Sequence, residues 1–188
     1  MIIVIRVVLL IIFAIVFYVT VYPWLMIGVG INLLPNPQKP VITYGEFPFR
    51  LVYEINGETK VVEDILICEY DGIGMDEGQG KYRKWKGYLA SGEERLLLLE
   101  VDNPAALRSN RKVVKQEIYY STGSARYYMG DMKDYETYKQ SFPDALYFEK
   151  YDDGGTSNGV IRADELYEKY RIKLKSWDYS QPIENEFT

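Results

Sequence analysis

The sequence contains no histidine and only one cysteine, Cys68. Histidine is the side chain that most often transfers protons near neutral pH, and it is the commonest ligand of transition metals. A single cysteine cannot form an intramolecular disulfide or a cysteine-rich zinc site, and without histidine no Cys–His nucleophile exists. Chemistry that needs these groups is excluded, and we expect Cys68 to be a small buried core residue.

Charge is almost absent from the first part of the chain. Arg6 is the only charged residue before Lys39, so residues 7–34 form an uncharged apolar run. Crossing the ~30 Å hydrocarbon layer of a bilayer takes ~20 apolar residues, and this run exceeds that length. We predict a single-pass transmembrane anchor over residues 1–34 that contacts membrane lipid through 7–34, with a kink or an end of the regular helix at Pro23.

Three alternatives to a retained anchor are a cleaved signal peptide, a lipoprotein and a buried core helix. A lipoprotein would need a cysteine directly after the apolar stretch, and Cys68 lies far downstream. A signal peptide has an apolar region of only ~7–15 residues and a small-residue cleavage site, and no Ala-x-Ala follows this longer run. The length and the lack of charge disfavour a core helix. A short tail with the basic Arg6 favours the N-terminus inside, although Lys39 and Arg50 nearly balance it. We expect a cell-membrane protein with an extracytoplasmic domain.

A proline-rich spacer over residues 35–40 leads into a soluble domain over 41–188. Its apolar runs, separated by Gly, Asn and Ser turns, predict a mainly β (α+β) fold: an antiparallel β-sheet or β-sandwich domain with short peripheral helices behind the transmembrane helix. Asn56-Gly57 is the favoured two-residue hairpin turn. Strands are predicted over 49–55, 59–70, 81–89, 95–101, 113–120, 125–129 and 172–179.

The predicted strands 81–89 and 95–101 are expected to pair about Ser91-Gly92, and 113–120 is expected to pair with 125–129. The glycine-rich stretch 71–80 is expected to be a loop. Helices are predicted over residues 163–170, where acidic residues come early and basic residues late, and as short turns over 131–138 and from 141.

The whole chain has 22 basic and 27 acidic side chains, a net charge of −5, and 15% of its residues are aromatic. Nucleic-acid affinity depends on clustered lysine and arginine, so we expect no nucleic-acid partner. Residues 81–86 form a basic strand interleaved with aromatic residues. We favour an edge strand that its lysines protect against aggregation; the alternative is contact with anionic lipid headgroups or an anionic wall polymer.

Residues 154–165 partly match the spacing of a calcium-binding EF-hand loop. Gly159 falls at the tight-turn position and Glu165 at the bidentate twelfth position. Gly154 supplies no side chain at the first position, so a neighbouring aspartate could take part only in a lengthened loop. The alternative is a turn at Asn158-Gly159 followed by a helix with an acidic first turn. The candidate calcium ligands are Asn158, Glu165, Asp153 and Thr156.

A second acidic segment carries Asp71, Asp76 and Glu77 among glycines. Paired carboxylates ~5–10 Å apart would suit glycoside hydrolysis. A solvated turn is the favoured interpretation, because glycine and aspartate are ordinary turn residues.

Two segments of the soluble domain, 41–58 (VITYGEFPFRLVYEINGE) and 157–174 (SNGVIRADELYEKYRIKL), resemble an uncharacterised family of small membrane-anchored proteins of Gram-positive bacteria. The similarity extends over most of the domain. It implies a location at the membrane and assigns no activity, cofactor or site residue.

We therefore predict a non-enzymatic binding or structural module on the outer face of the membrane, with an envelope protein or polymer as its partner. One alternative is a carboxylate-dependent hydrolase that acts on surface glycans, and another is a calcium-dependent module that uses residues 154–165. Two carboxylates facing each other in a pocket would favour the hydrolase, whereas an aromatic or basic face would favour binding.

Overall fold

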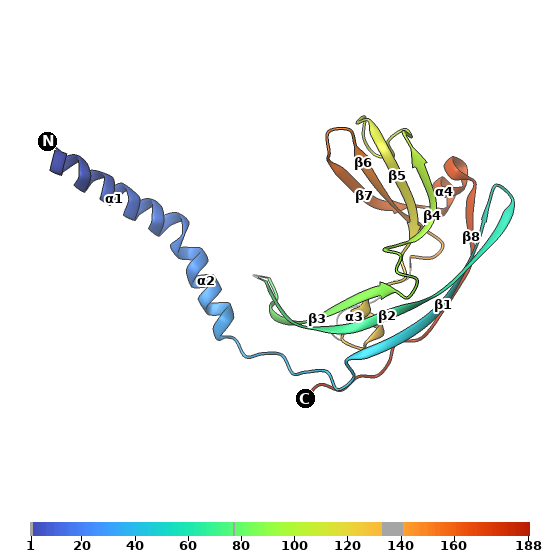
Figure 1. Cartoon of the computed structure of the whole chain (residues 1–188), viewed down its shortest axis with the longest axis horizontal. Coiled ribbons are helices and arrows are strands. Elements are labelled where there is room, and N and C mark those ends of the chain that lie inside the picture. Colours follow the sequence, from blue (N-terminus) through green and yellow to red (C-terminus); the bar gives the residue numbers. More distant parts are fainter. Residues whose placement is uncertain (1, 77, 133–140) are drawn as a thin grey trace. The chain divides into compact units, whose positions relative to one another are not determined.

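The computed structural model describes residues 2–76, 78–132 and 141–188. Its N-terminal segment consists of two apolar helices, α1 (Ile2–Thr20) and α2 (Tyr22–Leu33), which follow one another along the chain (Figure 1). The break between them falls at Val21, and Pro23 lies in the first turn of α2, where its missing N–H removes no helical hydrogen bond. The predicted interruption at Pro23 is confirmed.

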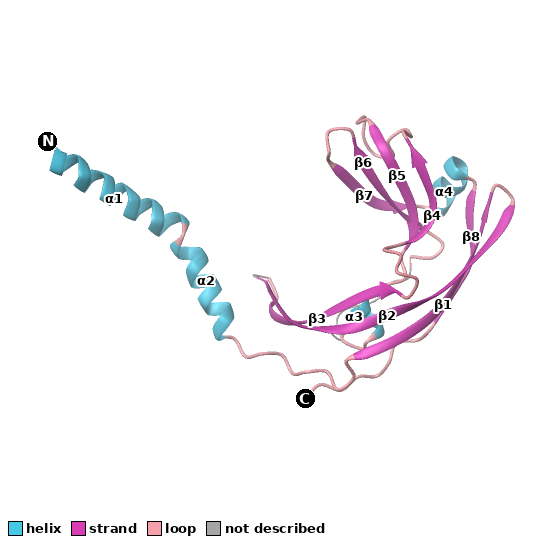
Figure 2. Cartoon of the chain, viewed as in Figure 1, coloured by secondary structure: helices cyan, strands magenta, loops and turns pink. Residues whose placement is uncertain are grey.

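The remaining described chain is mostly β-strand, with two short helices (Figure 2). It forms two four-stranded antiparallel sheets, in the orders β3-β2-β1-β8 and β4-β5-β6-β7, which confirms the predicted fold class. The strands are β1 (Tyr44–Ile55), β2 (Glu58–Asp76), β3 (Gly80–Leu89), β4 (Leu96–Asp102), β5 (Val113–Tyr120), β6 (Ala145–Tyr151), β7 (Thr156–Ile161) and β8 (Ile172–Tyr179), and the short helices are α3 (Ala125–Tyr128) and α4 (Ala163–Tyr170).

The first hairpin forms where the dipeptide Asn56-Gly57 predicts it. Both residues have positive φ, 53° and 83°, as a two-residue turn between right-twisted strands requires. The register runs from Ile55 opposite Glu58 to Tyr44 opposite Glu69 without a shift. Because side chains alternate along a strand, this register sends every second residue of β1 into the core.

One hydrophobic cluster draws on both sheets. Strand β1 contributes Phe47, Phe49, Leu51 and Tyr53, which are at most 7% exposed. The second sheet contributes fully or almost fully buried side chains such as Ile118, Tyr120 and Tyr147, and α4 adds Leu166. The domain is thus a β-sandwich held by aromatic and aliphatic packing, and Cys68 is a buried free cysteine, as predicted.

Several local predictions are wrong. Strands β3 and β4 belong to different sheets, because β4 pairs with β5 and buries Leu96 and Leu98 in the core shared by the two sheets. The predicted strand 125–129 is instead the short helix α3 and its C-cap Met129, since Ser124 Oγ accepts from the backbone N–H of Tyr127 as an N-cap.

Strand β2 extends to Asp76, so most of the predicted loop 71–80 is paired strand. No helix begins at Ser141, because the chain enters β6 at Ala145. In the predicted turn over 131–138, residues 133–138 lie outside the described part of the chain.

By its internal contacts the chain divides into two units. The first contains Met1–Lys39, Asp71–Lys84 and Thr188; the second contains Pro40–Tyr70 and Trp85–Phe187. The first unit therefore combines the apolar helices and the spacer with the far ends of β2 and β3. The second holds the sandwich core.

Candidate functional site

The four candidate calcium ligands are divided among strand β7, the turn before it and helix α4. Thr156 and Asn158 are on β7, opposite Lys150 and Phe148 of β6, so this part of the predicted loop is a strand. The predicted turn at Asn158-Gly159 is wrong. The turn instead lies at Gly154, which has a φ of 82°.

Both candidate carboxylates are engaged by arginine. Asp153 accepts a hydrogen bond from Arg111 and a 2.9 Å bond from the backbone N–H of Gly155, and Arg111 holds the pKa of Asp153 below its ordinary value. In the described ranges 2–76, 78–132 and 141–188, no group of three or more Cys, Asp or Glu side chains is placed to hold a metal ion. Calcium binding at 154–165 stays a prediction.

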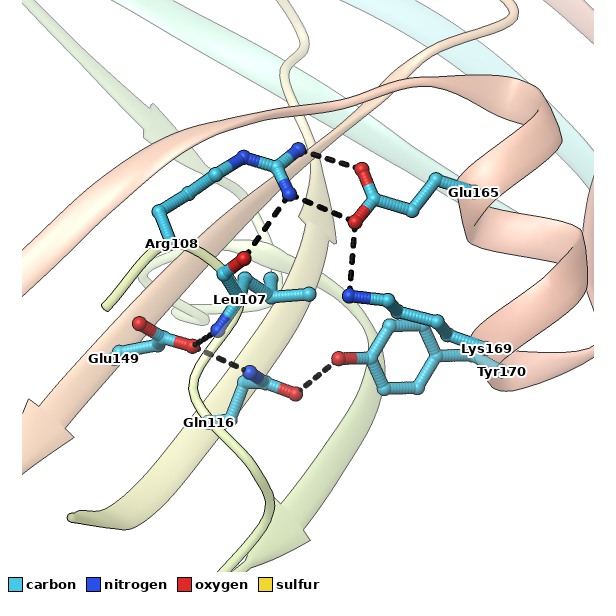
Figure 3. Close-up of polar contacts among 7 residues, drawn as sticks. All are labelled: Leu107, Arg108, Gln116, Glu149, Glu165, Lys169 and Tyr170. Atoms are coloured by element: carbon cyan, nitrogen blue, oxygen red, sulfur yellow. Dashed lines mark hydrogen bonds and ion pairs between the residues drawn. The ribbon is translucent and has the colours of Figure 1, made fainter. Parts of the chain in front are cut away.

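Glu165 lies in the first turn of the predicted helix α4 and forms a bidentate ion pair (Figure 3). Arg108 donates to its two oxygens at 2.7 and 2.5 Å, and Lys169 Nζ lies 2.9 Å from Oε1. The hydrogen bonds from Arg108 are the main cause that lowers the pKa of Glu165 from 4.5 to about 2. The pair ties the loop before β5 to α4.

We expect the Arg108→Met variant to lose less stability than the unaltered chain when the pH is lowered from 6 to 2.5. Glu165 titrates near pH 2 when folded and near 4.5 when unfolded, so its contribution is present above pH 4.5 and is lost as pH falls through 2. Arg108 is 46% exposed, so the contribution is only ~1 kcal/mol. Urea unfolding of the full chain in detergent at pH 6 and pH 2.5 measures it.

Lys169→Met is the matched control, because Lys169 lowers the pKa of Glu165 less than Arg108 does. It should retain most of the acid dependence. An Arg108→Met protein with an unchanged stability difference between the two pH values would contradict this assignment.

Beneath this ion pair lies a buried polar network centred on Glu149 (Figure 3). Glu149 and Gln116 are both 0% exposed. Glu149 Oε1 accepts from the backbone N–H of Leu107 at 2.8 Å and from Gln116 Nε2 at 2.7 Å. Its Oε2 accepts from the Tyr151 hydroxyl at 3.1 Å. A buried carboxylate held by three donors fixes the loop at Leu107 against the second sheet.

Tyr170, at the end of α4, completes this network. Its hydroxyl donates to Gln116 Oε1, so the amide donates to Glu149 with one end and accepts from α4 with the other. Burial raises the pKa of Tyr170 to about 12, which keeps the hydroxyl protonated and able to donate. The network is thereby satisfied internally and orients α4.

The second unit also contains an open cleft of about 280 Å³, here called the aromatic cleft. Trp85 and Tyr88 of β3 line it together with Tyr119 of β5, and Trp85 Nε1 donates to Asp131 at 2.7 Å, which fixes the indole. Polar groups share the lining with these rings: Glu94, Arg95, Ser121 and Thr122.

Arg95 is held rigidly at this cleft. Its guanidinium lies 5.0 Å from the centre of the Tyr119 ring and 4.5 Å from that of Phe148, and it donates to Glu117 at 2.8 Å. Rigid aromatic and cationic groups lose little conformational entropy on binding. The cleft can therefore stack against, and hydrogen-bond to, an extended polar ligand.

A shallower groove of about 640 Å³ lies on the outer face of the first sheet. Arg50 of β1 crosses it between Glu63, at 3.0 Å, and Asp178, at 3.8 Å. All three side chains are 45–68% exposed. The two carboxylates are thus separated by a cation, an arrangement typical of a solvated sheet face.

The acidic segment 71–77 forms no pair of facing carboxylates in its described residues. Lys84 Nζ lies 2.6 Å from Asp71, and Asp76 accepts from the backbone N–H groups of Gly78 and Gln79. Glu77 lies outside the described residues. The basic strand 81–86 is part of β3, an edge strand, as its favoured interpretation predicts.

No family profile, curated protein or solved structure matches the chain. Its function must be inferred from its own residues.

Sequence reasoning did not find Glu149, Gln116 or the aromatic cleft. The alternation of Ala145, Tyr147, Glu149 and Tyr151 would have placed Glu149 on the buried face of a strand. The cleft had no such signal, because it combines residues from β3, β5 and the segments before β4 and α3.

Proposed function

We propose that this chain is a single-pass envelope protein whose β-rich domain is a binding module on the outer face of a bacterial membrane. Residues 7–34 contact lipid, and the aromatic cleft takes an extended polar polymer of the envelope. The basic Arg6 at the head of the apolar run favours the N-terminus inside and the domain outside.

One observation carries the anchor: the N-terminal helices expose their apolar side chains. The segment Ile3–Thr20 has a mean hydropathy of 2.9 and none of it is buried, and α2 has no buried residue. Burying one large apolar side chain is favourable by ~1.5–3 kcal/mol, so a row of them is strongly unfavourable in water and favourable in lipid. The uncharged run also continues beyond the length of a signal-peptide core.

The lining of the aromatic cleft supports binding over hydrolysis. Its residues include one carboxylate, Glu94, whereas a glycosidase needs two facing carboxyl groups, one of them with a raised pKa. In the described chain, nearby cations lower the pKa of three carboxyl groups: Glu54 beside Lys175, Asp153 beside Arg111 and Glu165 beside Arg108. A carboxyl group with a lowered pKa is ionised near neutral pH, so it has no proton to donate there, and its carboxylate is a weak base.

Cysteine protection in intact cells tests both location and binding. Cys68 is buried and burial raises its pKa to about 12, so an introduced exposed cysteine is the reactive thiol. Glu94→Cys places a thiol at the rim of the cleft, and Val160→Cys, on β7, is the control outside it.

We expect a membrane-impermeant maleimide to label Val160→Cys in intact cells. Glu94→Cys should be labelled strongly only after enzymatic removal of the wall. Labelling of Val160→Cys only in permeabilised cells would contradict the outer-face location. Equal labelling of Glu94→Cys before and after wall removal would contradict polymer binding in the cleft.

A further inference from the structure

The far end of the β2–β3 hairpin is attached to the end of the apolar helices. We call residues 71–76 and 78–84 the hairpin end. They comprise the last part of β2, the turn residues 78 and 79, and the first part of β3, and all belong to the first unit. The Lys81 ammonium donates to the backbone carbonyls of Asn32 and Leu34, at 2.9 and 2.8 Å, and to Asn36 Oδ1 at 3.0 Å. These three acceptors use all three of its donors.

Lys81 therefore acts as a C-terminal cap supplied from another element. The last carbonyls of a helix lack intrahelical partners and carry the negative end of its dipole, so a lysine there is favourable. Two further contacts hold the same junction: Arg83 donates to the carbonyl of Gln38 at 3.3 Å, and Gly80 lies so close to Leu34 that a Cβ would meet its Cδ1 at 3.0 Å.

The face of the hairpin end that carries Lys81 also carries exposed apolar side chains. Tyr82 covers Gly74, since a Cβ on this glycine would lie within 2.8 Å of the Tyr82 ring and hydroxyl. Alternation along each strand then places Ile73 and Met75 on the face opposite Tyr82, together with Lys81 and Arg83. Ile73 is 37% exposed and Met75 is 52% exposed.

This face adjoins the end of an apolar helix that is itself exposed. Leu33 and Leu34 are 81% and 45% exposed, and Trp24 and Leu25 on the same helix are 62% and 52% exposed. The helices α1 and α2 contain 19 and 12 residues, which at 1.5 Å each exceed the ~30 Å hydrocarbon layer. If α1 crosses the bilayer, α2 begins at the headgroup layer, and its exposed apolar side chains, Trp24 among them, favour a position along that layer, which keeps the end of α2 at the lipid surface.

We propose that the hairpin end is a second membrane contact, in which Ile73 and Met75 enter the lipid surface beside the end of α2. Lys81 fixes their position, and Lys81 and Arg83 place positive charge at the level of the lipid phosphates, which attract it. The proposal rests on the membrane anchor of the proposed function.

The acidic groups of the described hairpin end do not oppose this contact. Asp71 is paired with Lys84, and Asp76 is held by two backbone N–H groups of its own turn. Apolar insertion and basic attraction therefore act on the same face. A lipid surface matches this combination, because it offers anionic phosphates directly above hydrocarbon.

Lipid quenching of a fluorophore at position 75 tests the contact in the full chain. Met75→Cys carries the label, and Val160→Cys is a control with the same exposed fraction, 52%. Leu10→Cys reports on the anchor. Each labelled protein is reconstituted into phosphatidylglycerol–phosphatidylcholine vesicles, with or without lipid that bears a nitroxide: near the headgroup for positions 75 and 160, and deep in the acyl chain for position 10, which lies near the midpoint of α1.

We expect the label at 75 to be quenched about twofold more strongly than the label at 160, since an interfacial side chain lies ~5–10 Å into the lipid boundary. The label at 10 should also be quenched. Equal quenching at 75 and 160, with strong quenching at 10, would overturn the second contact and leave the anchor intact. Absence of quenching at 10 would overturn the anchor as well.

Two further results are decisive. Protection of the label at 75 from aqueous iodide without nitroxide quenching would show a protein partner on this face and overturn the proposal. Lys81→Met, added to Met75→Cys, should reduce quenching at 75 toward the level at 160 and leave quenching at 10 unchanged. Unchanged quenching at 75 in this variant would contradict the role of Lys81.

Discussion

Val16→Arg together with Val19→Arg is expected to abolish membrane insertion of the full chain. An arginine costs ~2.5–3.5 kcal/mol at the centre of a spanning helix and less near its ends, so two arginines in every ~20-residue window of the run reduce the insertion equilibrium by about two orders of magnitude or more. The substitutions leave apolar segments 7–15 and 20–34, neither of which reaches the ~20 residues needed to cross. Translation in the presence of vesicles, followed by alkaline extraction, measures the inserted fraction.

The matched control adds two arginines elsewhere. Val61 and Val160 are exposed valines on the two sheets, at 48% and 52%, similar to Val16 at 52%. Val61→Arg with Val160→Arg should remain in the membrane pellet as the unaltered chain does. Equal retention of the Val16/Val19 variant would contradict insertion of α1.

Glu149→Ala is expected to destabilise the folded domain by ~3–5 kcal/mol, because three buried donors lose their acceptor and each costs ~1–3 kcal/mol when unsatisfied. These donors are the Leu107 N–H, the Gln116 amide and the Tyr151 hydroxyl. The loss is a large part of a typical stability of ~5–15 kcal/mol. Urea unfolding of the full chain in mild detergent, followed by tryptophan fluorescence, measures it.

Glu149→Gln separates the loss of hydrogen bonds from the loss of charge. Glutamine keeps the shape of the side chain and an acceptor oxygen, and its NH₂ can donate to the Tyr151 oxygen while that hydroxyl turns toward Ser109 Oγ, 3.3 Å away. We expect a cost below ~1.5 kcal/mol. An alanine variant as stable as the glutamine variant would show that the network does not stabilise the domain.

Local sequence signals predicted the elements whose residues determine their own conformation. Asn56-Gly57 forms its turn because both residues accept positive φ. Helix α4 begins and ends as its charge pattern predicts, with Asp164 and Glu165 in the first turn and Lys169 in the last. The apolar run and Pro23 likewise predicted the two N-terminal helices.

Predictions failed where distant contacts decide the structure. The chain changes sheets after β3 because β4 pairs with β5, which follows it in the sequence, and not with β3. Residues 125–128 have the composition of a strand, but the Ser124 cap and the bond from Tyr128 to the carbonyl of Thr122 favour a helical turn. Tertiary context overrides weak local propensity at such sites.

The candidate sites likewise differ in whether a local sequence pattern or contacts between distant residues define them. The calcium pattern rests on spacing within one segment, and spacing says nothing about Arg108 and Arg111, which bind Glu165 and Asp153 from a separate loop. The aromatic cleft and the junction of Lys81 with the end of α2 also join residues distant in sequence. Such sites become visible only when the fold is known.

The central claim is that the N-terminal helices reside in lipid and tether the β-rich domain. Full-length protein prepared without detergent, and then separated by ultracentrifugation and size-exclusion chromatography, tests it most directly. We predict that the protein stays with the membrane pellet after alkaline extraction and enters solution only with detergent. A monodisperse monomer in the aqueous fraction would contradict the account.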